Sequence, residues 1–132
     1  MAIEQRVVPV DDEAAGEVEA KVFQNFKEKK GKVPNWTRIM ANRPEIMASF
    51  VTLLSVTMGP GLVEQNNKWK CAYAVSKINK CKYCLGVVEG MLAQLGMEEE
   101  NIADVISDDK STLKPDEKIA VQYAEALTKD PA

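Results

Sequence analysis

The sequence predicts an all-α protein that forms one domain over residues 1–132. Apolar residues make up 45% of the chain, which is enough for a packed core. In most segments these residues recur at spacings of three and four, whereas no segment alternates apolar and polar residues as a half-buried strand would. Glycine and proline stand between the periodic segments, where helices commonly end and begin.

The first segment, residues 1–10, is expected to form an extended arm around Pro9. Acidic residues follow from Asp11, and lysines gather towards Lys30, which is the order that the helix dipole favours. A helix is therefore predicted over about 11–30, and Gly31 is expected to end it.

Two prolines mark the next helix starts. Pro34 is expected to open a short helix, and Pro44 to open a longer one that stops at Gly59. The apolar residues of the longer helix recur at three- and four-residue spacing, so a broad buried face is predicted. The residues of that face are Ile46, Met47, Phe50, Leu53, Leu54 and Met58.

The second half of the chain is predicted to hold four helices. The first spans about 63–78 and is expected to place one side inward, consisting of Cys71, Ala72, Val75 and Ile78. Asn79 is predicted to cap a second helix that Gly96 closes, and a short acidic helix follows over 97–107. Pro115 is expected to begin the last helix, with an inward side consisting of Ile119, Ala120, Tyr123, Ala124 and Leu127.

Charge and composition exclude several classes of function. A net charge of −3 offers no general attraction to nucleic acid or to an anionic membrane, so neither is expected as a partner. The N-terminus lacks the basic start and the apolar run of a signal peptide. The longest uncharged stretch, residues 46–63, is interrupted by polar residues, glycine and proline and does not resemble a membrane span. Three cysteines form no even disulfide framework, so a reducing cytoplasm is the expected location.

The Cys-x-x-Cys pair, Cys81 and Cys84, is the strongest chemical signal in the chain. Two thiols at this spacing can close a disulfide across one helical turn. A helix N-terminus and the nearby Lys77, Lys80 and Lys82 would both favour thiolate. A shift of about 1.5 pKa units would raise the ionised fraction at pH 7 from about 3% to about half.

Other interpretations of the cysteines remain open. Cys81 and Cys84 could simply fill a core as small apolar residues. A metal site is disfavoured because zinc normally takes four Cys or His ligands, and the chain has three Cys and no His. Cys71 would lie about 15 Å from Cys81 on a continuous helix, so it is expected to be a core residue.

The residues around the pair resemble the alkylhydroperoxidase D-like, or carboxymuconolactone decarboxylase, family and are closest to its peroxidase-related branch. The resemblance covers about residues 8–131. It rests first on the run that contains Ser76, Asn79, Cys81, Tyr83 and Cys84, and further on 31–35, 43–45 and 117–128. Members of that branch usually continue with more helix, so this chain is expected to end early relative to them.

This resemblance implies an alkylhydroperoxidase D-like helical bundle with the Cys-x-x-Cys at a helix N-terminus. It also implies homo-oligomers (a trimer or a hexamer) and a peroxiredoxin-like reduction of small peroxides without a metal or an organic cofactor. Carried onto this chain, Cys84 would attack the peroxide and Cys81 would resolve it as a disulfide, which a dithiol reductant protein would then reduce.

The chain departs from the family pattern at its proton relay. Trp69 stands where the family has Glu, and Val88 stands where it has His. Such a relay is typically worth about 10²–10⁴-fold in rate, so weak peroxide reduction is expected. Glu89 points about 140° away from Cys84 on an ideal helix, and Glu64 could approach only if the preceding turn folded over.

Two alternatives to this function therefore stay open. The chain could be a non-catalytic oligomeric scaffold or binding member of the family, and a decarboxylase or related lyase is less favoured. Trp69 is expected to fill the volume of the lost relay, and Tyr83 to contact either peroxide or a second subunit. The lysine group could recognise an acidic partner, although a solvated helix face is the simpler interpretation; it consists of Lys68, Lys70, Lys77, Lys80 and Lys82.

Overall fold

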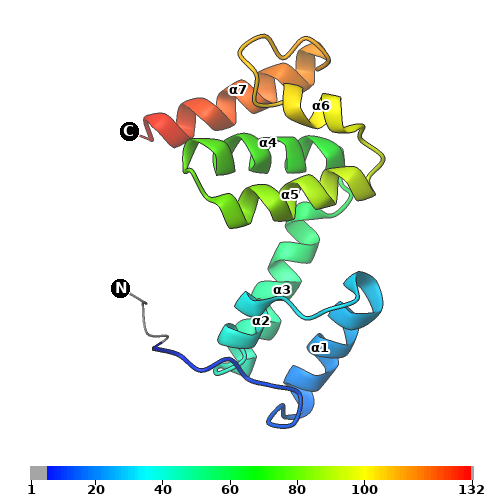
Figure 1. Ribbon diagram of the computed structural model, residues 1–132, viewed down its shortest axis with the longest axis vertical. Helices are drawn as coiled ribbons and strands as arrows, with labels where there is room; N and C mark the ends of the chain where they lie inside the picture. The colour runs from blue at the N-terminus through cyan, green and yellow to red at the C-terminus, as the bar shows by residue number, and fades with distance from the viewer. Residues whose placement is uncertain (1–5, 132) are drawn as a thin grey trace. The chain divides into compact units, whose positions relative to one another are not determined.

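The computed structural model describes residues 6–131, which contain seven α-helices and no strand (Figure 1). The predicted all-α class is therefore confirmed. The chain divides into two compact units, Met1–Thr57 and Met58–Ala132. That the whole chain forms one domain stays a prediction.

The first unit holds α1 (Glu17–Lys30), α2 (Asn35–Met40) and α3 (Pro44–Met58). Gly31 ends α1 in the left-handed conformation, with φ 73°, and its N–H donates to the carbonyl of Lys27. The predicted start of α1 at Asp11 is wrong. Asp11 accepts a hydrogen bond from the Ala14 N–H at 2.8 Å and so caps a separate turn, after which Gly16 is extended and begins α1.

The segment before α1 is attached to α2 through Arg38. The Val10 N–H donates to the Arg38 carbonyl at 3.0 Å, and the Arg38 guanidinium donates back to the Val10 carbonyl at 3.0 Å. The same guanidinium lies 3.1 Å from the Asp12 carboxylate. Residues 6–10 are not helical, whereas residues 1–5 of the predicted arm lie outside the described residues.

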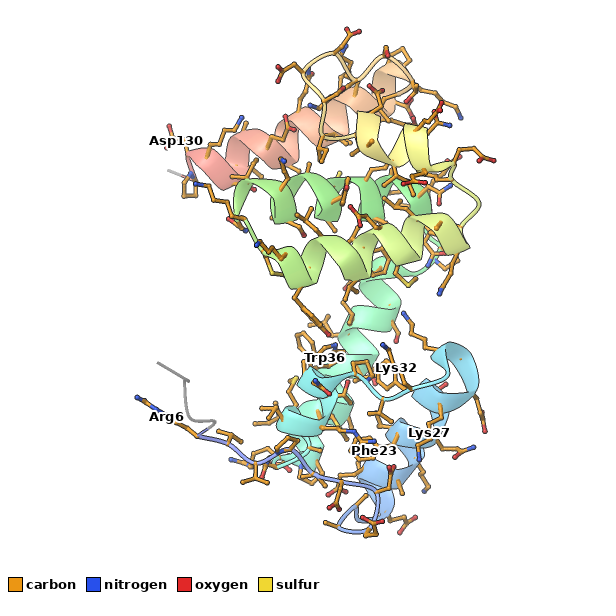
Figure 2. All side chains as sticks on the ribbon, viewed as in Figure 1. Arg6, Phe23, Lys27, Lys32, Trp36 and Asp130 are labelled. Carbon is orange, nitrogen blue, oxygen red and sulfur yellow. A yellow bond between two sulfur atoms is a disulfide. The ribbon has the colours of Figure 1, made fainter. Side chains whose placement is uncertain are left out.

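The first unit has a small buried core and a group of aromatic rings, of which Phe26 packs against that core. The ring of Trp36 meets the rings of Phe26 and Phe50 edge to face, with centroids 5.9 and 5.7 Å away. Figure 2 labels Trp36 and Phe23. The buried cluster consists of Phe23, Val33, Ala41 and Met47.

The broad buried face predicted for α3 is wrong. Of its six residues only Met47 is buried, Leu54 and Met58 are half-buried, and the other three are exposed. Apolar residues surround this helix on more than one side, while the small core of the unit covers one side only. The exposed large side chains of α3 are Ile46, Phe50, Leu53 and Val56.

The second unit is built on α4 (Gln65–Ile78), which packs against both α5 (Lys82–Gln94) and α7 (Pro115–Lys129). The short α6 (Glu99–Asp104) packs against α5 and is shorter than the predicted helix over 97–107. The core of this unit consists of Tyr73, Ala74, Val88, Leu92, Ile102, Val105, Leu113 and Val121.

Two of the predicted inward faces in this unit need correction. On α7, Ile119 and Tyr123 are each 66% exposed, and Leu127 is also exposed, whereas Val121 is fully buried. On α4, the residues predicted to face inward are only half-buried, and the deeper positions belong to Tyr73, Ala74 and Ser76, which were not predicted.

The orientation of α7 follows from two ion pairs with buried lysines. Lys70 Nζ on α4 lies 2.8 Å from Glu117 Oε1, and both side chains are nearly inaccessible. Glu117 Oε2 also accepts a hydrogen bond from the Lys114 N–H at 3.0 Å. Burial by itself raises the pKa of Glu117, but the hydrogen bonds and charges of Lys70 and Lys114 outweigh it and hold that pKa below its ordinary value.

The second ion pair lies further along α7. Lys110 Nζ is 3.1 Å from Glu125 and also donates to the Ser107 carbonyl at 2.7 Å. Lys110 itself is 5% exposed. Because the buried Lys70 and Lys110 both need anionic partners, Glu117 and Glu125 turn inward, and the larger apolar side chains Ile119, Tyr123 and Leu127 lie on the exposed side of α7.

None of the helices among residues 6–131 combines the length and the apolar character that crossing a membrane requires.

We predict that Glu117→Leu lowers the free energy of unfolding by about 3–5 kcal/mol, because Lys70 would stay buried without a partner. The double variant Lys70→Met/Glu117→Leu should recover most of that loss. Urea unfolding followed by circular dichroism gives both values. Glu17→Ala, which breaks the exposed pair with Lys21, is the matched control and should change stability by less than about 0.5 kcal/mol.

The same pair predicts a pH dependence. Because the folded-state pKa of Glu117 lies below the ordinary value of 4.5, its contribution is fully present above that pH and is lost as pH falls through the lowered pKa. The wild-type protein should therefore lose stability below about pH 4.5 more steeply than the double variant. Equal slopes for the two proteins would contradict this account.

Candidate active site

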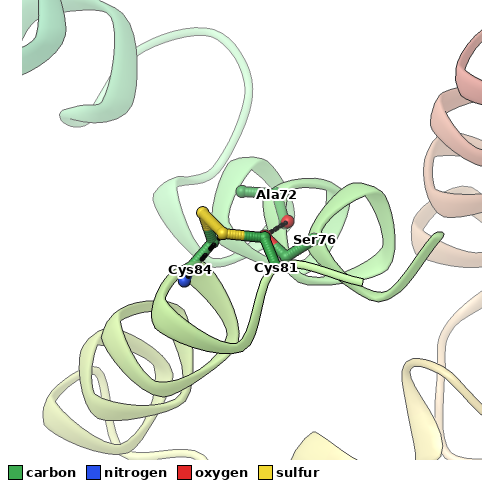
Figure 3. Close-up of a disulfide and its surroundings, with 4 residues drawn as sticks. All are labelled: Ala72, Ser76, Cys81 and Cys84. Carbon is green, nitrogen blue, oxygen red and sulfur yellow. Dashed lines mark hydrogen bonds between the residues drawn. A yellow bond between two sulfur atoms is a disulfide. The ribbon is translucent and has the colours of Figure 1, made fainter. Parts of the chain in front are cut away.

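The two cysteines of the predicted pair are joined. Cys81 and Cys84 form a disulfide at the start of α5, with their Cα atoms 5.3 Å apart. Both residues are half-buried, and neither belongs to the buried core cluster of the second unit. Figure 3 shows the disulfide beside Ala72 and Ser76 of α4. The Ser76 hydroxyl donates to the Ala72 carbonyl at 2.7 Å, which satisfies the hydroxyl within α4.

A tight corner between α4 and α5 positions the pair. Asn79 ends α4, and its N–H donates to the Val75 carbonyl at 3.0 Å. Lys80 follows in the left-handed region with φ 54°, and its N–H donates to the Lys77 carbonyl. The Cys81 N–H then donates to the Ser76 carbonyl at 3.1 Å, which returns the chain onto α4.

The corner makes Cys81 the N-cap of α5. The prediction that Asn79 caps this helix is wrong. Asn79 is instead the C-cap of α4, and its N–H donates to carbonyl groups of that helix. Cys81 has the extended conformation of an N-cap, and its Sγ accepts a hydrogen bond from the Cys84 N–H at 3.3 Å. The predicted placement of the pair at a helix N-terminus is nevertheless correct.

This hydrogen bond distinguishes the two sulfur atoms. An N–H group in the first turn of a helix has no partner within the helix and favours negative charge beside it. Once the disulfide is reduced, Cys81 Sγ is the sulfur that receives this stabilisation directly. The structure therefore fits Cys81 as a ready thiolate, both as a nucleophile towards a sulfur on Cys84 and as a leaving group from the disulfide.

The five lysines that the sequence groups near the pair have different environments. Lys70 is buried against Glu117, and Lys68 Nζ donates to the Gly59 carbonyl at 2.8 Å. The other three are exposed: Lys77, Lys80 and Lys82. Only these three lie at the corner and in the first turn that carry the disulfide.

The relay positions are occupied by core residues. Val88 is 5% exposed and belongs to the core of the second unit, and Trp69 packs against the same core. The indole N–H of Trp69 is buried and has no hydrogen-bond partner among residues 6–131. Neither side chain can accept a proton from a thiol, so these two positions supply no base.

The two carboxylates that sequence reasoning considered as substitutes are placed elsewhere. Glu89 accepts a hydrogen bond from the Tyr73 hydroxyl at 2.5 Å and lines a cavity of about 480 Å³ between α5 and α6. Burial, together with the bond and charge of Glu89, raises the pKa of Tyr73, so this tyrosine stays a donor. Glu64 is exposed just before α4. Sequence reasoning missed the Tyr73–Glu89 pair, which no local motif marks.

The third cysteine, Cys71, is a free thiol that packs against the core of the second unit and is half-buried. Burial is the main cause of the raised pKa of this thiol, although the Lys70 charge opposes it. A raised pKa leaves the thiol protonated and poorly nucleophilic at neutral pH. Cys71 is therefore suited as an internal control for the chemistry of the pair.

We predict that reduced Cys81 is alkylated by iodoacetamide at a lower pH than Cys84. The comparison uses Cys71→Ser/Cys84→Ser against Cys71→Ser/Cys81→Ser, so that each protein holds one thiol. A helix-terminal amide is worth about 0.3–1 kcal/mol, which corresponds to a difference of about 0.5 pH unit in the midpoint of the labelling rate. The difference should vanish in urea, and a lower midpoint for Cys84 in the native protein would contradict the asymmetry.

Comparison with known proteins supports the fold. No protein-family model and no curated protein sequence matches the chain. Among solved structures, an uncharacterized peroxidase-related protein from Silicibacter sp. TM1040 matches 95% of this chain with a TM-score of 0.76 and 24% identity. The chain covers 64% of that protein, which is less than two thirds of its length.

A second solved structure, the alkylhydroperoxidase AhpD core from Rhodospirillum rubrum ATCC 11170, matches 97% of this chain with a TM-score of 0.66 and 22% identity. The chain covers 92% of that protein. At this level of identity the likeness concerns the arrangement of the helices. The fold predicted from the motif around Cys81 and Cys84 is thereby confirmed: the chain has the alkylhydroperoxidase D-like fold.

Proposed function

We propose that the protein is a thiol-dependent oxidoreductase that reduces alkyl hydroperoxides slowly through a Cys81/Cys84 dithiol–disulfide couple. The observation that carries the proposal is the pair itself: two half-buried sulfurs joined at a helix start, with the Cys81 sulfur on a main-chain N–H. The fold shared with an alkylhydroperoxidase core and a peroxidase-related protein adds support.

The proposed cycle starts from the dithiol. The Cys84 thiolate attacks the outer peroxide oxygen, the O–O bond breaks, and the alkoxide leaves and takes a proton to become the alcohol. Cys84 is now a sulfenic acid. The Cys81 thiolate, held by the Cys84 N–H, attacks this sulfur, and the S–O bond breaks with release of water. A dithiol reductant protein returns the two electrons and two protons by thiol–disulfide exchange.

We expect a low rate because the two positions where the family pattern has its proton relay hold Trp69 and Val88, and Cys84 would need such a relay. Trp69 and Val88 cannot take the proton of this thiol or pass it to the leaving alkoxide. Glu89 is engaged by Tyr73 instead. General acid–base help is typically worth about 10²–10⁴-fold, so we expect a rate lower by about this factor than in a protein with a complete relay.

A non-catalytic role is the second candidate, and a specific observation favours it. Trp69 and Val88 fill the relay region with hydrocarbon that packs in the core, which stabilises the fold and removes the base. In that case the disulfide would serve only to link the N-cap of α5 to its first turn. The protein would then act as an oligomeric scaffold or binding module.

Single-turnover oxidation separates the two candidates. We predict that the reduced protein converts stoichiometric tert-butyl hydroperoxide to the alcohol and forms the Cys81–Cys84 disulfide at least about tenfold faster than free cysteine at the same pH. Cys84→Ser should abolish the gain. Cys81→Ser should leave a sulfenic acid at residue 84 that dimedone traps, and Cys71→Ser should change nothing. A rate equal to that of free cysteine would favour the scaffold.

We further propose that the chain forms a homo-oligomer. The outward side of α7 carries Ile119, Tyr123 and Leu127 at four-residue spacing, all exposed, as one continuous apolar row. A second copy of the chain would remove this row from water.

We predict that Ile119→Ser/Tyr123→Ser lowers the mass measured by sedimentation at micromolar concentration, because burial of these side chains contributes about 1.5–3 kcal/mol each. The matched control is Leu62→Ser, which changes an apolar residue that is even more exposed, in the loop between α3 and α4. A wild-type protein that sediments as a monomer would contradict the proposal.

A further inference from the structure

The segment of the sequence that holds the disulfide differs in net charge from the chain as a whole. The protein carries 17 basic and 20 acidic residues, yet residues 65–88 contain five lysines and no acidic residue. This segment comprises α4, the corner and the first turns of α5. The disulfide therefore lies in the longest stretch of the sequence that is free of acidic side chains.

Three of these lysines are available to a partner. Lys77, Lys80 and Lys82 are exposed, and within residues 6–131 none of them forms an ion pair. Lys80 has a left-handed backbone at the corner, and Lys82 is the first residue of α5. The remaining two lysines, Lys68 and Lys70, are engaged by a carbonyl and a carboxylate.

An exposed apolar pair lies beside the same disulfide. Tyr83, between the two cysteines, is 58% exposed, and Val87, one turn further along α5, is 41% exposed. Residues four apart on a helix are neighbours on its surface. Exposed tyrosine and exposed cations close together in the sequence are the residue types found in protein–protein interfaces, where tyrosine is enriched at the centre and charged groups lie at the rim.

We propose that this surface, which consists of Lys77, Lys80, Lys82, Tyr83 and Val87, docks an acidic dithiol protein that reduces the Cys81–Cys84 disulfide. The proposal rests on the redox couple of the proposed function and names the chemistry of its partner. Carboxylates around the partner's thiols meet the three lysines, and an apolar side chain of the partner covers Tyr83. Complementary charge of this kind raises the association rate in a salt-dependent way.

The exchange step is balanced within the two proteins. One partner thiolate attacks Cys84 Sγ, a mixed disulfide forms, and the Cys81–Cys84 bond breaks with Cys81 leaving as a thiolate next to the Cys84 N–H. The second partner thiol loses its proton and displaces Cys84 from the mixed disulfide. Two electrons pass from the partner to the pair, which takes up two protons, and the partner becomes a disulfide.

The experiment uses reduced dithiol peptides as probes, with dithiothreitol as an uncharged reference. One peptide carries a Cys-Gly-Pro-Cys sequence flanked by four Glu, and the other carries the same sequence flanked by four Lys. The rate of reduction of the full-length disulfide is followed by acid quenching and mass spectrometry. We expect the acidic peptide to react about tenfold or more faster than the basic one at 20 mM salt, and this ratio to fall towards one at 0.5 M salt.

Variants assign the effect to the proposed surface. Lys77→Gln/Lys80→Asn/Lys82→Gln removes the three charges, with Asn at 80 because it tolerates the left-handed conformation. This variant should lose most of the preference for the acidic peptide. Lys29→Gln/Lys32→Gln/Lys129→Gln has the same net charge and exposed substitutions elsewhere, and it should keep the preference. Melting curves of both variants establish that they fold.

The outcomes distinguish this proposal from the proposed function. A ratio near one in the wild-type protein, or an equal loss of preference in both triple variants, would overturn the docking surface even if peroxide is reduced. A preference that depends on the three lysines would support the surface even if peroxide reduction is absent. Failure of dithiothreitol itself to reduce the disulfide in the native protein would overturn both.

Discussion

The hydrogen bond from the Cys81 N–H to the Ser76 carbonyl is the contact on which the geometry of the candidate site depends. It closes the corner between α4 and α5, which only works because Lys80 accepts a left-handed backbone. The corner leaves Cys81 outside the first turn of α5 and Cys84 inside it. The sulfur of the first residue can then meet the amide of the fourth, while the two sulfurs remain close enough to join. The redox chemistry proposed for the pair requires this backbone conformation.

The corner is held in place by the packing of the second unit. The central α4 carries the buried Lys70, whose partner Glu117 fixes α7, while Tyr73 reaches across to Glu89 on α5. These polar contacts join α4 to both of its neighbours. Val88 lies in the core of this unit, and Trp69 packs against it. The helices on either side of the corner are thus joined to the rest of the unit by packing and by polar contacts.

Sequence reasoning succeeded where the cause is local. Gly31 ends a helix because it tolerates a positive φ, and Pro44 begins one because its own φ suits a first turn. Sequence reasoning failed where residues far apart in the chain determine a helix boundary or the side of a helix that is buried. Asp12 is engaged by Arg38 and Lys27, far along the chain, and the helix starts only after it. Similarly, the spacing of Ile119 and Tyr123 revealed an apolar row, but Lys70 and Lys110 decided that this row faces outward.

The same distinction applies to the site. The motif located the cysteines at a helix start, yet Asn79 and Cys81 are both acceptable caps, and only the backbone of α4 shows which of them is used. The lysines near the pair could be counted from the sequence, whereas burial of Lys70 and the bond from Lys68 to a carbonyl could not be foreseen. The sequence shows that residues 65–88 contain no carboxylate. Only the structure shows that three lysines of this segment, Lys77, Lys80 and Lys82, are exposed.

The redox equilibrium of the pair in glutathione buffers tests the central claim most directly. At each ratio of reduced to oxidised glutathione, free thiols are alkylated and the protein is weighed by mass spectrometry after digestion. If the corner couples the two sulfurs, Cys81 and Cys84 will change together as one two-electron couple, with Cys71 remaining a free thiol throughout. Independent glutathione adducts on Cys81 and Cys84, without an internal disulfide at any ratio, would contradict the account.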